Sequence, residues 1–190
     1  MVSDHSKGSP ALIRRVVVSI VAFIVLALLC VWLTNLVIVG RPLQAAMLKD
    51  TRNAGIRTSA HLQHFVNLNV LVFNLQGVSA QNSRLDALRV FLLFAEQEKT
   101  RKFTAVQLEC QGQSRFILKG DYFQQLGREY QDQNPVYTIR TLAENVYNLD
   151  GRAAFGPSGG GLAGLTDELT QFTNFMDSWC FRILAKQLSN

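Results

Sequence analysis

The sequence predicts an α+β protein in which a single N-terminal transmembrane helix precedes a small globular domain and a C-terminal amphipathic helix. Three observations predict this arrangement: an uncharged apolar run between Arg15 and Arg41, alternating strand and helix periodicities after it, and a heptad-like apolar pattern near the C-terminus. The expected segments are a cytoplasmic tail at 1–15, a transmembrane anchor at 16–39, a connector at 40–64, the α+β domain at 65–150, a glycine-rich hinge at 151–164 and the amphipathic helix at 165–188.

The run from Val16 to Val39 has the length of a membrane span. As a helix it is about 36 Å long, against about 30 Å for the hydrocarbon core of a bilayer. A core helix is usually polar on one side, and the apolar region of a secretory signal is only about 7–15 residues long. The one candidate processing site, before Cys30, has the bulky Leu29 where a small residue is needed. These features favour an uncleaved anchor.

The charges beside the run favour one orientation. Lys7, Arg14 and Arg15 precede it and Arg41, Lys49 and Arg52 follow it, so the counts of basic residues are balanced, but the Arg14–Arg15 pair directly abuts the run. Because basic residues are retained on the cytoplasmic side, the N-terminus is expected in the cytoplasm. In a bacterium, the chain would then be a single-pass protein of the inner (plasma) membrane with a periplasmic C-terminal domain.

The domain shows strand and helix periodicities in a definite order. The expected elements are a strand from Phe65, a helix at 84–98 capped by Asn82 or Ser83, a strand at 103–110, a turn at Gln111–Gly112, a strand at 114–120, a helix from Asp121 and a strand at 136–142. This order suits the split βαβ, or ferredoxin-like, fold, with both helices on one face of the sheet. A loop over residues 136–149 is the alternative to this last strand.

The charge balance argues against a nucleic-acid partner. Beyond Gly40 the chain has 16 Lys and Arg against 13 Asp and Glu, a balance of +3 spread over 150 residues. Nucleic-acid-binding domains concentrate far more basic charge on one face. The partners expected are therefore the lipid bilayer and other protein chains.

No motif in the sequence predicts a catalytic, cofactor-binding or metal-binding residue. Phosphate-binding, dinucleotide-binding and nucleophile-elbow patterns are all absent from the sequence. His61 and His64 have no Cys, Asp or Glu nearby in sequence, so they are interpreted as exposed linker residues. The stretch "FGPSGGGLAG" is interpreted as a flexible hinge in preference to an anion-binding loop.

Two cysteines outside the apolar run leave two interpretations open. Cys110 and Cys180 could form a disulfide in an oxidising compartment. The interpretation favoured here is that each packs as a small buried apolar residue. Cys30 lies inside the predicted span and is expected to be inert.

The C-terminal segment carries the predicted partner-binding residues. Counting from Leu165, apolar residues recur at spacings of 4, 3, 4, 3 and 4; the five assigned to partner binding are Leu169, Phe172, Met176, Trp179 and Ile183. Either the sheet of the same domain covers this apolar stripe, or the glycine hinge lets the helix dock on another protein or a second copy.

These features favour a non-catalytic, membrane-anchored scaffold or interaction subunit of a cell-envelope assembly. It would bind its partners through the α+β domain and the C-terminal helix. Two alternatives remain: a membrane-bound enzyme with an unrecognised site, and a sensor domain for a small periplasmic ligand. A compact pocket with convergent polar groups would favour these alternatives.

Overall fold

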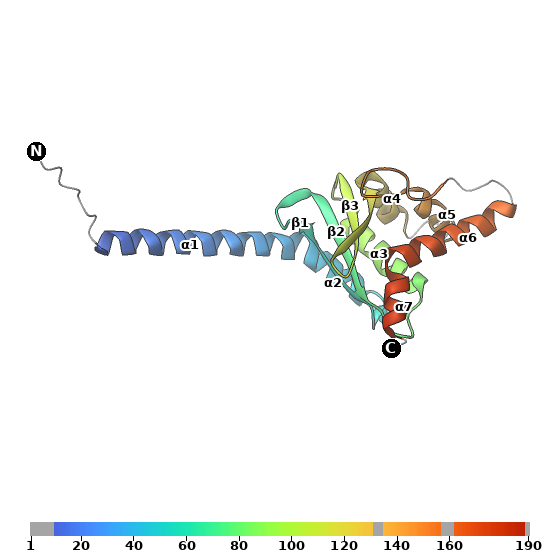
Figure 1. The fold of residues 1–190 in the computed structure, drawn as a ribbon, viewed down its shortest axis with the longest axis horizontal. Coiled ribbons are helices and arrows are strands. Elements are labelled where there is room, and N and C mark those ends of the chain that lie inside the picture. Colours follow the sequence, from blue (N-terminus) through green and yellow to red (C-terminus); the bar gives the residue numbers. More distant parts are fainter. Residues whose placement is uncertain (1–9, 131–134, 157–161, 189–190) are drawn as a thin grey trace, which may run out of the picture.

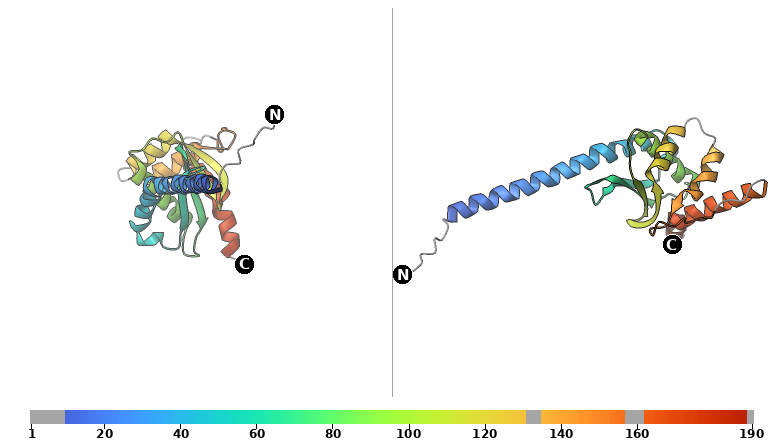
Figure 2. Two further views of the ribbon diagram at one scale, coloured as in Figure 1. Left: turned by 90° about the vertical axis from the view of Figure 1, so that its left-hand side faces the viewer. Right: turned by 90° about the horizontal axis from the view of Figure 1, so that it is seen from above.

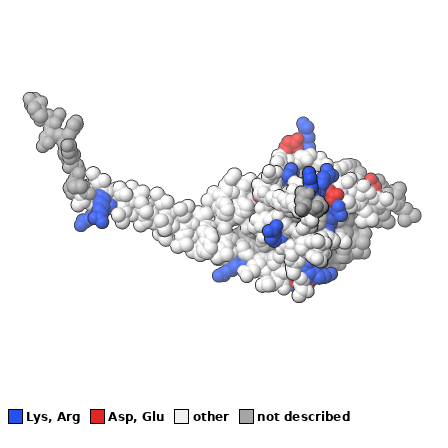
Figure 3. All heavy atoms as spheres, turned by 60° about the horizontal axis from the view of Figure 1, so that its bottom comes forward, with Lys and Arg blue, Asp and Glu red and all other residues white. Residues whose placement is uncertain are grey.

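The computed structural model, which describes residues 10–130, 135–156 and 162–188, has a long helix that runs out from an α+β domain (Figure 1). Helix α1 (Pro10–Asn35), the π-helical segment η1 (Leu36–Gly40) and α2 (Arg41–Leu48) follow one another directly. Ile13–Leu48 is long and apolar enough to span a membrane, and none of its most apolar stretch is buried against the domain. In Figure 3, basic side chains mark the N-terminal start of this helix, and the surface between them and the domain is uncharged in this view.

The domain is built on a five-stranded mixed sheet with the strand order β1-β2-β3-β4-β5. The strands are β1 (Arg57–Gln63), β2 (Asn67–Gly77), β3 (Ala105–Cys110), β4 (Gln113–Lys119) and β5 (Val146–Tyr147). Strands β2 and β3 are parallel, whereas the other neighbours are antiparallel. The β1–β2 hairpin projects back toward the N-terminal end of α1 (Figures 1 and 2).

Helices cover one face of this sheet. They are α3 (Arg84–Glu98), α4 (Gly120–Glu129), α5 (Pro135–Glu144), α6 (Leu162–Met176), the π-helical η3 (Asp177–Phe181) and α7 (Arg182–Leu188). A short 3-10 turn, η2 (Thr51–Asn53), precedes β1. The ring of Phe73 on β2 contacts the rings of Phe91, Phe94 and Trp179 at centroid distances of 5.1–5.9 Å. The core therefore joins β2, α3 and the C-terminal helix.

Several predicted elements are confirmed. Helix α3 has the predicted bounds, and Ser83 and Asp86 form a capping box at its start. The hairpin of β3 and β4 turns at Gln111 and Gly112, whose φ angles are +52° and +79°. These angles suit the type I′ turns that match the twist of a two-stranded hairpin. The coarse prediction of an α+β domain behind a long apolar helix is thus confirmed.

The predicted split βαβ arrangement is wrong. In that fold, a third strand separates the two parallel strands of the βαβ unit. Here β3 pairs directly with β2, and β4 lies on the outer side of β3. The other side of β2 is taken by β1, a strand that falls inside the segment expected to be a connector. Helix α3 therefore connects β2 to β3, which is its direct neighbour in the sheet.

The strand predicted at 136–142 is also wrong, because these residues belong to helix α5. Several β-branched residues gave the segment its strand-like composition. Pro135 opens the helix, a position that proline favours, and Thr138 and Leu142 are buried one helical turn apart. The packing of α5 against α6 therefore overrides local strand propensity, and among the described residues β5 is the strand that pairs with the outer side of β4.

The C-terminal helix bends at its π-helical segment (Figure 1). A π turn adds one residue to the helical repeat and shifts the phase of every later side chain. As a result, Leu184 is buried, five residues after the buried Trp179, while the predicted Ile183 is only half-buried. Residues 157–161, in the middle of the predicted hinge, lie outside the described residues.

Candidate functional site

The helix-free face of the sheet carries two cross-strand rows of mainly polar residues. One row pairs His61, Val72, Gln107 and Ile117 across β1 to β4. The second row pairs Ser59, Asn74, Glu109 and Ser114 in the same way. Because alternate strand residues face opposite sides, most of the apolar strand residues face the helices, and most of the outward-facing ones are polar, with Val72 and Ile117 as exceptions.

The polar side chains are linked by hydrogen bonds along one cleft. The amide of Gln63 donates to Gln107 at 3.2 Å, and the amide of Gln107 donates to Ser114 Oγ and to Glu109 Oε1. Ser114 Oγ also donates to Glu109 Oε1 at 3.2 Å. The cleft has a volume of about 290 Å³ and is also lined by His61, His64, Phe65 and Val72.

His61 is one of the residues that line this cleft. Its ring is half-buried and stacks on the ring of Phe65, with centroids 4.7 Å apart. Burial lowers the pKa of His61, while the nearby Glu109 carboxylate opposes this shift. A neutral imidazole, two amides and one carboxylate suit a small polar ligand that is neutral or carries a positive charge.

The same residues do not assemble a nucleophilic relay. Ser114 Oγ donates a hydrogen bond to Glu109. Within the described ranges, no hydrogen bond links Ser114 to His61. Among residues 10–130, 135–156 and 162–188, no three His, Cys, Asp or Glu side chains are grouped closely enough to hold a metal ion. His61 belongs to β1 and His64 to the turn after it, so His61 is not the exposed linker residue that was expected.

The predicted partner-binding residues are mostly inside the domain. Phe172, Met176 and Trp179 are buried, and Ile183 packs against the same core. Leu169 is the exception, because 55% of it is exposed on the outer side of α6. The domain's own sheet and helices therefore cover the apolar stripe, as in the first of the two interpretations of this helix.

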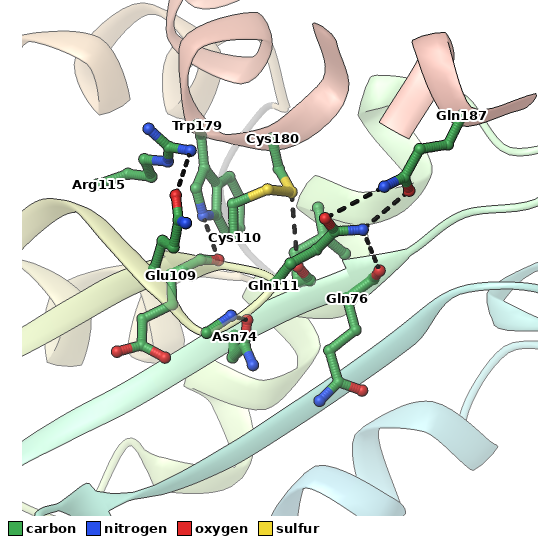
Figure 4. Close-up of a disulfide and its surroundings, with 12 residues drawn as sticks. Asn74, Gln76, Glu109, Cys110, Gln111, Arg115, Trp179, Cys180 and Gln187 are labelled. Carbon is green, nitrogen blue, oxygen red and sulfur yellow. Dashed lines mark hydrogen bonds between the residues drawn. A yellow bond between two sulfur atoms is a disulfide. The ribbon is translucent and has the colours of Figure 1, made fainter. Parts of the chain in front are cut away.

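Trp179 is held by a polar contact as well as by packing. Its indole Nε1 donates to the backbone carbonyl of Glu109 at 2.9 Å, and its ring stacks on Phe175 with centroids 5.8 Å apart. Figure 4 shows the indole directed from the C-terminal helix toward β3. This arrangement attaches η3 to the sheet.

A disulfide joins the same two elements, which corrects the favoured interpretation of the cysteines. Cys110, at the end of β3, is bonded to Cys180 of η3 (Figure 4). Gln111 and Gln187 exchange side-chain hydrogen bonds at 2.8 and 3.3 Å just beyond it. Sequence spacing could not reveal this pair, because 70 positions separate the two cysteines.

A further polar residue, Asn35, joins the long helix to the domain. Its amide donates to the Phe65 carbonyl at 2.6 Å and to the Val31 carbonyl at 3.0 Å. Its side-chain oxygen accepts the backbone N–H of Leu62 at 2.9 Å. Asn35 is also buried at the β1–β2 turn; its only signal in the sequence is that it is the one strongly polar side chain in the apolar run.

Comparison with known proteins gave no matching protein-family model, no similar curated protein and no similar solved structure.

Proposed function

We propose that this chain is a single-pass membrane protein whose C-terminal domain serves as a non-catalytic interaction subunit of a cell-envelope assembly. The length and uncharged surface of α1 support the anchor. The bridge between Cys110 and Cys180 supports an oxidising, extracytoplasmic location for the domain, since such bonds are rare in the cytosol. With Arg14 and Arg15 before the span, the N-terminus would lie in the cytoplasm.

The observation that carries the proposal is the continuous, hydrogen-bonded junction between the long helix and the domain. Helix α1 continues through η1 into α2, and α2 packs on α3. The side chain of Asn35 adds two hydrogen bonds to the β1–β2 turn. A soluble enzyme on a flexible tether does not need such a junction. A subunit that must contact its partners at a fixed distance from the membrane and in a fixed orientation benefits from such a junction.

The outer face of α6 is the proposed contact for a partner. Its inner face is occupied by the core, whereas Leu169 and Thr173, one turn apart, are exposed. The Thr173 hydroxyl donates to the Leu169 carbonyl at 2.9 Å, so both lie on the same side. In this proposal Phe172, Met176 and Trp179 hold the helix in position, and Leu169 contacts the partner.

Site-specific photo-crosslinking tests this proposal. A photoreactive amino acid at Leu169, in cells that produce the full-length chain, should give one discrete adduct. The matched control is the exposed Gln125 on α4, which should not give that adduct. Thr173→Arg should abolish the adduct without changing the melting temperature. The same set of adducts at both positions, or a chain released from membranes by alkaline carbonate, would count against the proposal.

The polar cleft supports a second candidate, a sensor of small polar ligands. Its support is the convergence of Gln63, Gln107, Glu109 and Ser114 on one cleft of about 290 Å³. A screen of small neutral and cationic compounds by thermal shift would test it. Glu109→Gln should remove the response to a cation and leave the melting temperature of the free protein nearly unchanged.

A further inference from the structure

The turn between β1 and β2 exposes three large apolar side chains. Phe65, Val66 and Leu68 are 54%, 63% and 56% exposed. The chain carries no Lys, Arg, Asp or Glu between Arg57 and Arg84, so no charged side chain of this hairpin lies beside them. A contiguous apolar patch without charges is typical of a surface that another phase or molecule covers.

The backbone of this turn is strained at His64 and Phe65. His64 and Phe65 have φ angles of +52° and +64°, and a bulky side chain rarely adopts positive φ. Asn–Gly is the usual choice for this kind of turn. The ring of Phe65 stacks on His61, and Asn35 holds the carbonyl of the same residue. Strain of this kind persists where the surroundings fix it, and it is concentrated at functional positions.

The turn also lies at the height where a bilayer would end. Twenty helical residues at about 1.5 Å each cover the roughly 30 Å of a hydrocarbon core. Counted from Val16, directly after the Arg14–Arg15 pair, the twentieth residue is Asn35. Asn35 is hydrogen-bonded to the turn, and Trp32, one helical turn earlier, is 59% exposed. Tryptophan at this depth is typical of the membrane interface.

We infer that Phe65, Val66 and Leu68 form a second membrane contact, which enters the interfacial layer of the bilayer on the side where α1 leaves it. This inference rests on the proposed membrane span of α1. The bilayer is the occupant because the turn is hydrogen-bonded to the long helix at Asn35, lies at the level where that helix would leave the hydrocarbon core, and has no charged residue. Two contacts, a helix and a hairpin tip, fix the tilt of the domain on the membrane.

Fluorescence quenching in lipid nanodiscs tests the contact. The full-length chain with Cys30→Ser takes a single environment-sensitive NBD (nitrobenzoxadiazole) probe at one introduced cysteine, while Cys110 and Cys180 remain bridged. Val66→Cys reports on the tip, and Gln76→Cys, exposed at the other end of β2, is the matched control. Ile24→Cys reports separately on the span. The quenchers are phosphatidylcholine with a shallow or deep doxyl group, and aqueous iodide.

The expected result is several-fold stronger quenching by shallow doxyl lipid at position 66 than at position 76, with the opposite order for iodide. If deep doxyl lipid quenches the probe at position 24 but shallow doxyl lipid does not quench at 66, the tip inference fails and the anchor stands. If neither site is quenched by lipid, the anchor itself fails. Protection from both iodide and lipid at position 66 would overturn the inference in favour of a protein contact, such as a second copy.

Discussion

Removing the bridge between Cys110 and Cys180 should cost the domain a large part of its stability. The two residues are 70 positions apart. For a closed loop of this size, chain entropy gives about 15 cal/mol/K, or about 4.4 kcal/mol at 25 °C. For a chain of this length, such a change lowers the melting temperature on the order of 10–15 °C. The loss should come mainly from the unfolded state, which gains freedom when the loop is open.

The fluorescence of Trp179 can report the unfolding of the domain. This residue is buried, and Trp32 is the only other tryptophan in the chain. In a Trp32→Phe, Cys30→Ser background, the fluorescence of Trp179 should shift to the red as the domain unfolds. The oxidised protein is compared with the reduced protein and with a Cys110→Ala, Cys180→Ala variant. Equal unfolding midpoints for all three would refute the reasoning, as would quantitative alkylation of both thiols in freshly isolated protein.

Three further predictions concern other parts of the chain. Asn35→Leu leaves the buried Leu62 N–H without its acceptor, so it should destabilise the junction by about 1–3 kcal/mol and speed hydrogen exchange in the β1–β2 turn. Burial raises the pKa of Glu98 from 4.5 to about 7, against the effect of Arg101. The folded state therefore favours the protonated acid, and urea midpoints should fall as the pH rises from about 4.5 through 7; Glu98→Gln should flatten this dependence. Leu92→Ala should cost about 2–5 kcal/mol, and an unchanged denaturant midpoint would place Leu92 outside the core.

Sequence patterns were sufficient to predict the elements whose structure depends on residues that are close together in the chain. The apolar length of α1, the capping box of α3 and the Gln111–Gly112 turn each depend on neighbouring positions. The β1–β2 hairpin was not predicted, because its turn uses His64 and Phe65 in a conformation that usually marks Asn–Gly. Its first strand has a polar composition, RTSAHLQ, without a clear apolar alternation.

The missed features of the candidate site depend on contacts that are distant in sequence. His61 lies in the same cleft as Gln107, Glu109 and Ser114 because β1 pairs with β2 in the sheet. The sequence showed that the C-terminal helix has an apolar stripe. It could not show whether the same domain or another protein covers that stripe, because cores and interfaces share the same residue types. The π turn then changed which residue is buried, so Leu184 replaced Ile183.

Strand β2 connects the two ends of the molecule. At its start, the turn that leads into it is hydrogen-bonded to Asn35 of α1. Near its other end, Leu75 pairs with Cys110, and the bridge continues to Cys180 in the C-terminal helix. Because the middle of β2 is buried and paired on both sides, we expect a change in the angle between α1 and the sheet to strain the contacts of Asn35 before it deforms β2. We therefore expect the position of the proposed partner surface on α6 to follow the orientation of α1 in the proposed membrane span.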